Sequence, residues 1–386
     1  MNLKKKIACK VPFGTLTIGE ECVSEMTRIL NEGRLTCGEL VEKFEKQFAK
    51  TMGRKFAVAV SSGTDANTLA LASLHYAGSA VRGKSQVIIP ALTFVATANS
   101  VVNAGLVPRF VDVKKNTLNL DDEIVERYIN RYTVAIMPVH LMGKPANMQA
   151  ICTLAKRKGL FVIEDAAEAH GAEYRSKMVG SFSHMTCYSL YAAHIVSSVE
   201  GGMITTDDEN LAEILRSLRN HGLQHYGSNW EFRRIGFNAK MNEMEAVIGL
   251  SNIKRFKDIL NKRRRNLFYL SESFAEFDKY FHYTKEESYE RIGPHAFAII
   301  LKERLPFTKE QLVDWYNSNG IDNRNLFYCI PTQCPAYSDS FKTVSQFPNA
   351  EYCSKFGTHI GVHQDLTHQQ LNYVVDKTRE FLQKHT

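Results

Sequence analysis

Residues 56–206 alternate short apolar segments with amphipathic ones, and this alternation restricts the fold more than any other feature of the chain. The apolar segments are nearly continuous, which is typical of strands buried on both faces of a sheet. They lie at 56–60, 87–90, 109–113, 135–139, 160–164 and 203–206. Because parallel strands need helical connections between them, the pattern predicts an α/β fold with a mostly parallel sheet.

The alternation ends after Arg255. A long basic helix is predicted next, then a strand near Ala296–Lys302 and helices near 308–318 and 367–383. A chain of 386 residues is also longer than one compact core usually needs. We therefore expect a large α/β domain over residues 1–255 and a smaller α+β domain over 256–386.

Composition argues against several classes of partner. The longest apolar runs are too short to cross a membrane, and the basic residues Met1–Lys6 are not followed by the apolar run of a secretory signal. The net charge of +7 is spread along the chain, and the basic run Lys262–Arg265 is interpreted as a solvated helix face. Neither nucleic acid nor a membrane is expected as a partner, although the positive bias favours an anionic ligand.

The eight cysteines are scattered, and none forms a C-x-x-C pair. This spacing gives little support to a zinc or redox motif or to an iron–sulfur cluster, so no metal site is predicted. It suits a reduced, cytoplasmic protein.

Three positions next to predicted strands are candidates for ligand binding. Ser61–Thr64 joins a strand to a helix, where free backbone N–H groups bind phosphate, although a turn with Thr64 as N-cap explains it equally well. Phe94 follows a strand end and is either a ring platform or a core aromatic. Asp165 ends the strand 160–164 and is either a ligand contact at the sheet edge or a helix N-cap.

Two motifs complete the pattern. Glu164-Asp165-Ala-Ala-Glu168-Ala-His170-Gly closes one strand, and Ser189-Leu-Tyr-Ala-Ala-His194 precedes Glu200-Gly-Gly. Together they resemble the DegT-type sugar aminotransferases, and the resemblance extends from Pro12 to Phe381. It implies the fold of pyridoxal phosphate (PLP)-dependent transferases, with a large, mostly parallel seven-stranded sheet domain and a smaller C-terminal α+β domain.

The resemblance also assigns roles to individual residues. An aromatic at Phe94 would stack on the pyridine ring, Asp165 would pair with the ring nitrogen, and Glu168 stands where many relatives carry glutamine. Asn238 matches a segment that reaches the phosphate of the neighbouring subunit, which implies a homodimer with shared active sites. The residues implied to bind the cofactor are Ser62, Gly63, Thr64, Phe94, Asp165, Glu168, Ser189 and Asn238.

His194 occupies the position at which the family normally carries the lysine that holds the cofactor covalently. Histidine cannot replace that bond, but its ordinary pKa of about 6.5 suits a general base. One branch of the family, the nucleotide-sugar 3-dehydratases, has this replacement and uses untethered pyridoxamine phosphate (PMP). The resemblance therefore implies removal of the C3 hydroxyl from a 4-keto-6-deoxy sugar in deoxysugar and O-antigen biosynthesis, with His194 as catalytic base.

Within that branch, the scattered cysteines favour the GDP-linked type, which restores PMP with glutamate, over the CDP-linked type with an iron–sulfur cluster. His221 and His363 are candidate substrate contacts, but His225 stands near a place where the GDP type has arginine. The other histidines, at 140, 170, 184 and 225, are interpreted as structural. Two alternatives remain open: an aminotransferase that uses free PMP, and a silent PLP-binding relative.

Overall fold

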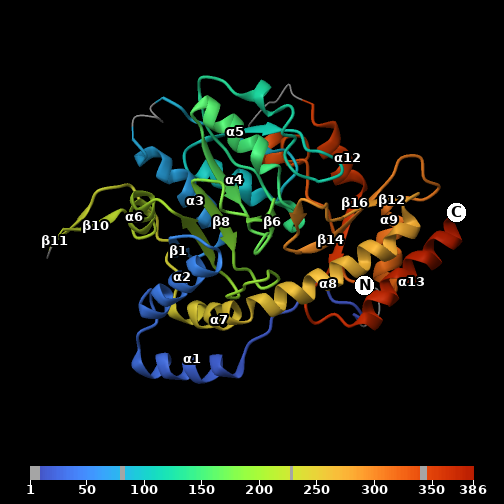
Figure 1. Ribbon diagram of the computed structural model, residues 1–386, viewed down its shortest axis with the longest axis horizontal. Helices are drawn as coiled ribbons and strands as arrows, with labels where there is room; N and C mark the ends of the chain where they lie inside the picture. The colour runs from blue at the N-terminus through green and yellow to red at the C-terminus, as the bar shows by residue number, and fades with distance from the viewer. Residues whose placement is uncertain (1–8, 79–82, 227–228, 340–345) are drawn as a thin grey trace.

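The computed structural model describes residues 9–78, 83–226, 229–339 and 346–386. Its largest sheet has seven strands in the order β1-β9-β8-β5-β4-β2-β3 (Figure 1). Only β9 is antiparallel to its neighbours, so the predicted mostly parallel seven-stranded sheet is confirmed. The bounds are β1 (Phe56–Val60), β2 (Gln86–Pro90), β3 (Val107–Val111), β4 (Thr133–Ile136), β5 (Phe161–Asp165), β8 (Met185–Ser189) and β9 (Gly202–Thr206).

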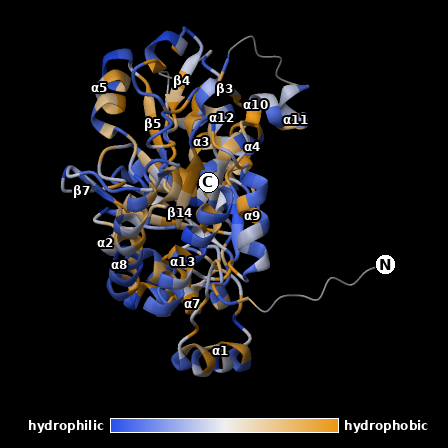
Figure 2. Cartoon of the chain, turned by 90° about the vertical axis from the view of Figure 1, so that its right-hand side faces the viewer, coloured by the Kyte–Doolittle hydropathy of each residue, from blue (hydrophilic) through white to orange (hydrophobic). Residues whose placement is uncertain are grey.

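Helices cover both faces of this sheet because alternate strand residues point to opposite sides. In β1, Val58 and Val60 join a core with α3 and α4, whereas Ala57 and Ala59 pack with α2. Figure 2 shows the resulting apolar centre and the more polar outer surfaces. The covering helices are α2 (Glu39–Thr51), α3 (Gly63–Ser73), α4 (Val95–Asn103), α5 (Met148–Lys158), α6 (Glu209–Leu218) and α7 (Glu243–Lys254).

Helix α8 (Phe256–Phe274) leads from this unit to a second, antiparallel sheet of four strands, β12-β14-β16-β15 (Figure 1). Together with α9 and α13, this sheet has the predicted α+β character. Val11, near the N-terminus, pairs with Ile321 and belongs to this second core, so the domain boundary after residue 255 stays a prediction. The bounds are β12 (Phe281–Tyr283), β14 (Ala296–Leu301), β15 (Asn323–Asn325), β16 (Gly357–Gly361), α9 (Lys309–Ser318) and α13 (His368–His385).

Shorter elements decorate the two units. Helix α1 (Glu20–Glu32) lies against α7, and the hairpin of β10 (Leu223–Tyr226) and β11 (Asn229–Phe232) projects from the body (Figure 1). The remaining elements are β6 (Glu173–Tyr174), β7 (Lys177–Met178), β13 (Glu290–Arg291), α10 (Ile330–Gln333), α11 (Pro335–Ser338), α12 (Pro348–Phe356), η1 (Leu74–Tyr76), η3 (Val125–Tyr128), η4 (Leu141–Gly143) and η5 (Ala275–Phe277). Within the described ranges, no helix is long and apolar enough to span a membrane.

Three local predictions were wrong, one of them the strand predicted at 135–139, which is observed as β4 at Thr133–Ile136. Ser62, rather than Thr64, caps α3, because its side chain accepts the hydrogen bond from the backbone N–H of Asp65. The strand predicted at 109–113 begins at Val107 instead, because proline at 108 is tolerated on β3, which is an edge strand.

Candidate active site

Four strands of the large sheet bring the predicted site residues to one edge. Because β1 and β8 are each antiparallel to β9, they run in the same direction, which β5, β4 and β2 share. Ser62–Thr64 follows β1, Phe94 follows β2, and Asp165 and Ser189 end β5 and β8. All four positions therefore lie at the carboxyl edge, where α/β sheets bind ligands.

The turn between β1 and α3 packs directly against the end of β8. A Cβ atom added to Gly63 would lie 2.6 Å from the Ser189 Cβ, so a larger residue would displace the serine. The Ser62 hydroxyl donates to the Asp65 carboxylate at 2.9 Å, and Thr64 follows, half-buried, in the first turn. The backbone N–H groups of this turn and the Ser189 hydroxyl thus converge, as phosphate binding requires.

Asp165 presents a buried carboxylate at the middle of this edge, with 4% of its surface exposed. Its Oδ2 accepts hydrogen bonds from Asn67 at 2.8 Å and Thr97 at 2.9 Å, and its Oδ1 accepts one from the Ala167 N–H at 3.2 Å. Burial raises its pKa, while the three donors favour the charged form. The residues that follow Asp165 form turns, so its interpretation as a helix N-cap was wrong.

Phe94 leaves most of its ring open to solvent. It is 58% exposed, and its ring centroid lies 5.7 Å from that of Phe327. The core-aromatic alternative is therefore wrong, and a largely open aromatic ring stands near the carboxyl end of β2.

His194 lies half-buried in the loop between β8 and β9. Its ring faces two other imidazoles, with centroids 4.9 Å away for His295 and 6.0 Å away for His170. Its Nδ1 is buried without a hydrogen-bond partner. Burial lowers the pKa of His194 well below 6.5, and the neighbouring His170 and Arg263 add to this effect. The ring is therefore uncharged at neutral pH.

Glu168 lies beside this group of imidazoles. Its Oε2 accepts a hydrogen bond from the Met142 N–H at 2.7 Å, and its Oε1 is 3.5 Å from the His295 Nε2. Burial raises the pKa of Glu168 to about 8, and the charge of Asp165 contributes in the same direction. The side chain is therefore mostly protonated at neutral pH and can donate a hydrogen bond.

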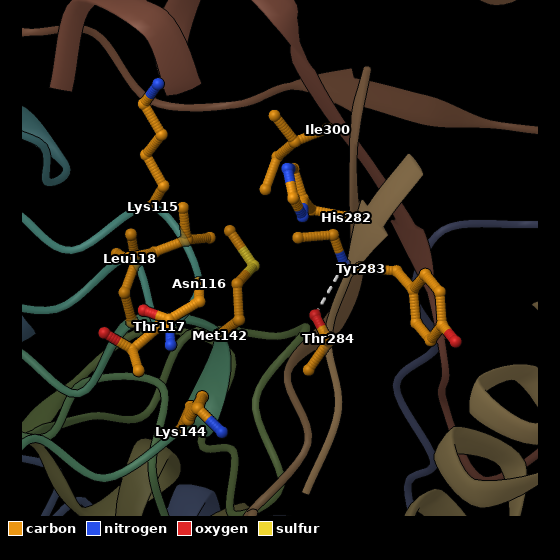
Figure 3. A pocket seen from close by; sticks show the side chains of 12 residues that line it. Lys115, Asn116, Thr117, Leu118, Met142, Lys144, His282, Tyr283, Thr284 and Ile300 are labelled. Atoms are coloured by element: carbon orange, nitrogen blue, oxygen red, sulfur yellow. Dashed lines mark hydrogen bonds between the residues drawn. The ribbon is translucent and has the colours of Figure 1, made fainter. Parts of the chain in front are cut away.

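A narrow crevice lies on the other side of Met142, between the two sheets. Figure 3 shows the side chains of 115–118 on one wall and those of 282–284 on the other. Its volume of about 10 Å³ has room for about one water molecule. The crevice is too small for a sugar, and none of the residues predicted for the site lines it.

The predicted residues His221 and Asn238 lie on neighbouring segments, which are joined by a bridge between Asn220 and Asn238. Both predicted residues are exposed. The Ser61 N–H donates to the Ala239 carbonyl at 3.0 Å, which places this segment beside the phosphate turn of the same chain. The predicted contact of Asn238 with a second subunit and that of His221 with substrate stay predictions.

His363 is buried, and its ring nitrogens contact two backbone segments. Its Nδ1 accepts a hydrogen bond from the Asp365 N–H at 3.3 Å, so its Nε2 carries the proton that is donated to the Pro12 carbonyl at 3.2 Å. Burial lowers its pKa to about 4. Its predicted contact with substrate stays a prediction.

The histidines interpreted as structural differ from one another. His140 bridges the Ala146 N–H and Glu164, and His184 accepts from a backbone N–H, as expected of structural residues. His170 is fully buried next to His194, yet neither of its ring nitrogens has a hydrogen-bond partner. The side chain of residue 225 lies outside the described part of the structure.

Four residues near the site were not found from sequence: Asn67, Thr97, Arg263 and His295. The first two hold Asp165, and His295 faces His194. Arg263 is only 1% exposed, so the interpretation of Lys262–Arg265 as a solvated face was wrong for this residue. Each of the four comes from a different element and shows no local motif.

The arrangement fits pyridoxal or pyridoxamine phosphate. Gly63 brings the N-terminus of α3 close to the Ser189 hydroxyl, so that backbone N–H groups and a hydroxyl are available to a phosphate, and Asp165 offers a buried acceptor for a ring N–H. Phe94 offers a flat apolar surface. His194 offers an imidazole whose Nδ1 has no hydrogen-bond partner, and it offers no amine.

Comparison with known proteins gives matches over nearly the whole chain. GDP-4-keto-6-deoxy-D-mannose 3-dehydratase of Yersinia pseudotuberculosis is 31% identical, over 95% of this chain and 98% of its own length. GDP-perosamine synthase of Caulobacter vibrioides is 35% identical, over 88% of this chain and 89% of its own length.

Solved structures show the same architecture. Escherichia coli GDP-4-keto-6-deoxy-D-mannose-3-dehydratase, determined with bound hydrated PLP, matches with a TM-score of 0.89 at 29% identity, covering 96% of this chain and 99% of its own. The Helicobacter pylori aminotransferase PseC matches with a TM-score of 0.88 at 24% identity, covering 97% and 99%, which supports the fold alone. The chain belongs to the DegT/DnrJ/EryC1/StrS aminotransferase family, whose model it matches over residues 16–379.

Proposed function

We propose that this protein is a PLP/PMP-dependent nucleotide-sugar 3-dehydratase. It removes the C3 hydroxyl of a 4-keto-6-deoxy sugar, and GDP is the favoured nucleotide. Its relatives support a sugar-modifying enzyme that uses this cofactor. The narrower assignment rests on His194, an uncharged and half-buried imidazole, which by the family resemblance occupies the position of the aminotransferases' lysine.

The residues at the sheet edge hold the cofactor without a covalent bond. The first turn of α3 and Ser189 bind its phosphate, Phe94 covers one face of its ring, and Asp165 accepts a hydrogen bond from its protonated ring nitrogen. When bound, PMP supplies the amine that condenses with the C4 ketone and, on conversion to the aldehyde, the two electrons that replace the C3 hydroxyl by hydrogen, with release of ammonia.

His194 moves the proton. Its Nδ1 is enclosed, so its Nε2 is the nitrogen that would take a proton from the bound cofactor. Because burial keeps the ring uncharged, it is ready to act as a base at neutral pH, and once protonated it is a strong acid. It can then give the proton to the departing C3 hydroxyl, which leaves as water.

We propose that the enzyme is a homodimer with shared sites and that glutamate restores PMP. The hairpin of β10 and β11 carries Trp230 and Phe232, which are both more than half exposed, and Ile235 follows with 89% exposure. Outward apolar residues on a projecting hairpin are typical of an interaction surface. Asn238, three residues after Ile235, is near enough to this surface to reach a second subunit.

The second candidate is amino transfer to the same ketone through free PMP. The GDP-perosamine synthase of Caulobacter vibrioides, at 35% identity, supports this alternative. Both relatives carry GDP in their names, so both candidates favour a GDP-linked substrate.

Product mass distinguishes the candidates. The purified protein is incubated with PMP and GDP-4-keto-6-deoxymannose, and the CDP-linked counterpart is tested in parallel. A nucleotide-sugar that has lost one oxygen atom and keeps its ketone supports the dehydratase. Replacement of the ketone by an amine supports the aminotransferase, and cofactor binding without turnover indicates a silent relative.

The control for this experiment is His194→Asn, which keeps a polar side chain but cannot act as a base. It should bind PMP and lose the dehydrated product. Dehydration at the wild-type rate in this variant would show that another group removes the proton.

A further inference from the structure

Arg263 lies in α8, the helix that joins the two sheets (Figure 1), and its side chain is buried. Its Nη2 donates to the carbonyls of Ala193 at 3.0 Å and His194 at 3.2 Å. Its Nε donates to the Gln364 Oε1 at 2.9 Å, and its Nη1 lies 3.5 Å from the Pro294 carbonyl. One side chain thus connects the loop of His194 to the segment that leads into β14.

All of these contacts are with neutral groups. The neighbouring Lys262 and Arg264 pair with Asp258 and Glu286, whereas no carboxylate of the described ranges forms an ion pair with Arg263. Asp365 attracts it from farther away, and burial lowers its pKa to about 10. Burying a cation without a close counter-charge costs free energy, so we expect Arg263 to have a role beyond packing.

The groups that face His194 come from several segments around it. His170 lies in the turn after β5, His295 precedes β14, and Tyr191 belongs to the same loop. Glu168, protonated at neutral pH, approaches through His295. Among these groups, Arg263 carries a permanent positive charge. This charge disfavours protonation of His170, His194 and His295.

We propose that Arg263 is the positioning residue of this site: it fixes the backbone of His194 relative to His295 and places a positive charge with no close counter-ion beside this group of imidazoles. The catalytic role of Arg263 in this inference rests on the proposed function. Its effect on the protonation of His194 can be measured without cofactor or substrate.

The test measures carbethoxylation of His194 by diethyl pyrocarbonate, which modifies imidazole only in its uncharged form. Cofactor-free protein is treated between pH 5 and 8, and residue 194 is quantified by peptide mass, with the exposed His221 as internal reference. Wild-type reactivity should stay nearly constant down to pH 5.5. In Arg263→Met the titration midpoint of His194 should rise, although burial continues to hold it below 6.5, so its reactivity should begin to fall at a higher pH than in the wild type.

Two further variants sharpen this test. Arg265→Met, at an exposed position of the same helix, should titrate like wild type. Gln364→Glu places a carboxylate 2.9 Å from the Arg263 Nε without emptying the site, so it tests the charge even if Arg263→Met does not fold. It should also raise the midpoint of His194.

The proposal would be overturned if the titration midpoint of His194 were unchanged in Arg263→Met or in Gln364→Glu. It would also be overturned if Arg265→Met shifted this midpoint as much as Arg263→Met does. Because no turnover is measured, failure here is distinct from failure of the dehydratase assignment. A wild-type product that gains an amine would refute the assignment and leave the titration result in place.

Discussion

Replacing Glu168 by glutamine should change how the stability of this protein depends on pH. The pKa of this carboxyl is about 8, against an ordinary value of 4.5, mainly because the side chain is buried. Glutamine has the same shape and cannot ionise, and its amide oxygen can still accept the hydrogen bond from the Met142 N–H. The substitution therefore removes the titration with little change in packing.

The magnitude follows from proton linkage. Between pH 4.5 and 8 the folded protein keeps a proton that the unfolded chain has lost, so the free energy of unfolding falls as pH rises. The slope is about 1.36 kcal/mol per pH unit, which amounts to about 2–3 kcal/mol between pH 5.5 and 7.5. Relative to wild type, Glu168→Gln should gain this amount over that interval, because the contributions of the histidines are largely common to both proteins.

Urea unfolding at pH 5.5 and 7.5, at one fixed protein concentration, measures this difference. The control is Glu213→Gln, at an exposed position of α6, which should run parallel to wild type. If the difference between Glu168→Gln and wild type is the same at both pH values, Glu168 is ionised in the folded protein and the reasoning is refuted.

Three other outcomes are expected. Ser189→Ala should raise the Kd for PMP about tenfold or more, because a hydrogen bond to the phosphate is lost; calorimetry that finds an unchanged Kd would contradict the phosphate site. Three imidazoles near the site, His170, His194 and His295, have pKa values lowered by burial and take up protons on unfolding, so these three alone should contribute a fall of about 2–4 kcal/mol per pH unit in the free energy of unfolding as pH drops below 6.5, and the buried His359 and His363 act in the same direction; urea curves that do not change between pH 6.5 and 5.5 would exclude this. Replacing both Trp230 and Phe232 by serine should shift a dimer towards monomer in sedimentation, and a fully retained dimer would locate the interface elsewhere.

Much of the fold was readable from sequence because the central strands are buried on both faces and so consist of apolar runs. β1, β2, β5 and β9 were predicted to within one residue at each end. β3 and β4 were displaced by two to three residues, β3 because Pro108 does not look like a strand residue. The position of Pro108 on an edge strand depends on the order of the strands, which local sequence does not encode.

The candidate site, like the fold, was predicted only in part from the sequence. Asp165, Ser189 and His194 belong to contiguous motifs, and the structure brings the first two to one edge of the sheet and places His194 in the loop that follows. Their roles towards cofactor and substrate stay predictions. Arg263 and His295 were missed because a basic run resembles a solvated helix face and a single histidine carries no pattern. Their meaning depends on contacts with residues far away in the sequence.

In our proposal, the cofactor is not covalently bound and His194 stands in place of its lysine. Borohydride reduction of the PLP-loaded protein, followed by peptide mass mapping, tests it directly. We expect no pyridoxyl-lysine peptide from the wild-type site, whereas His194→Lys should carry the pyridoxyl group on residue 194. A stoichiometric pyridoxyl group on any lysine of the wild-type protein would contradict the account.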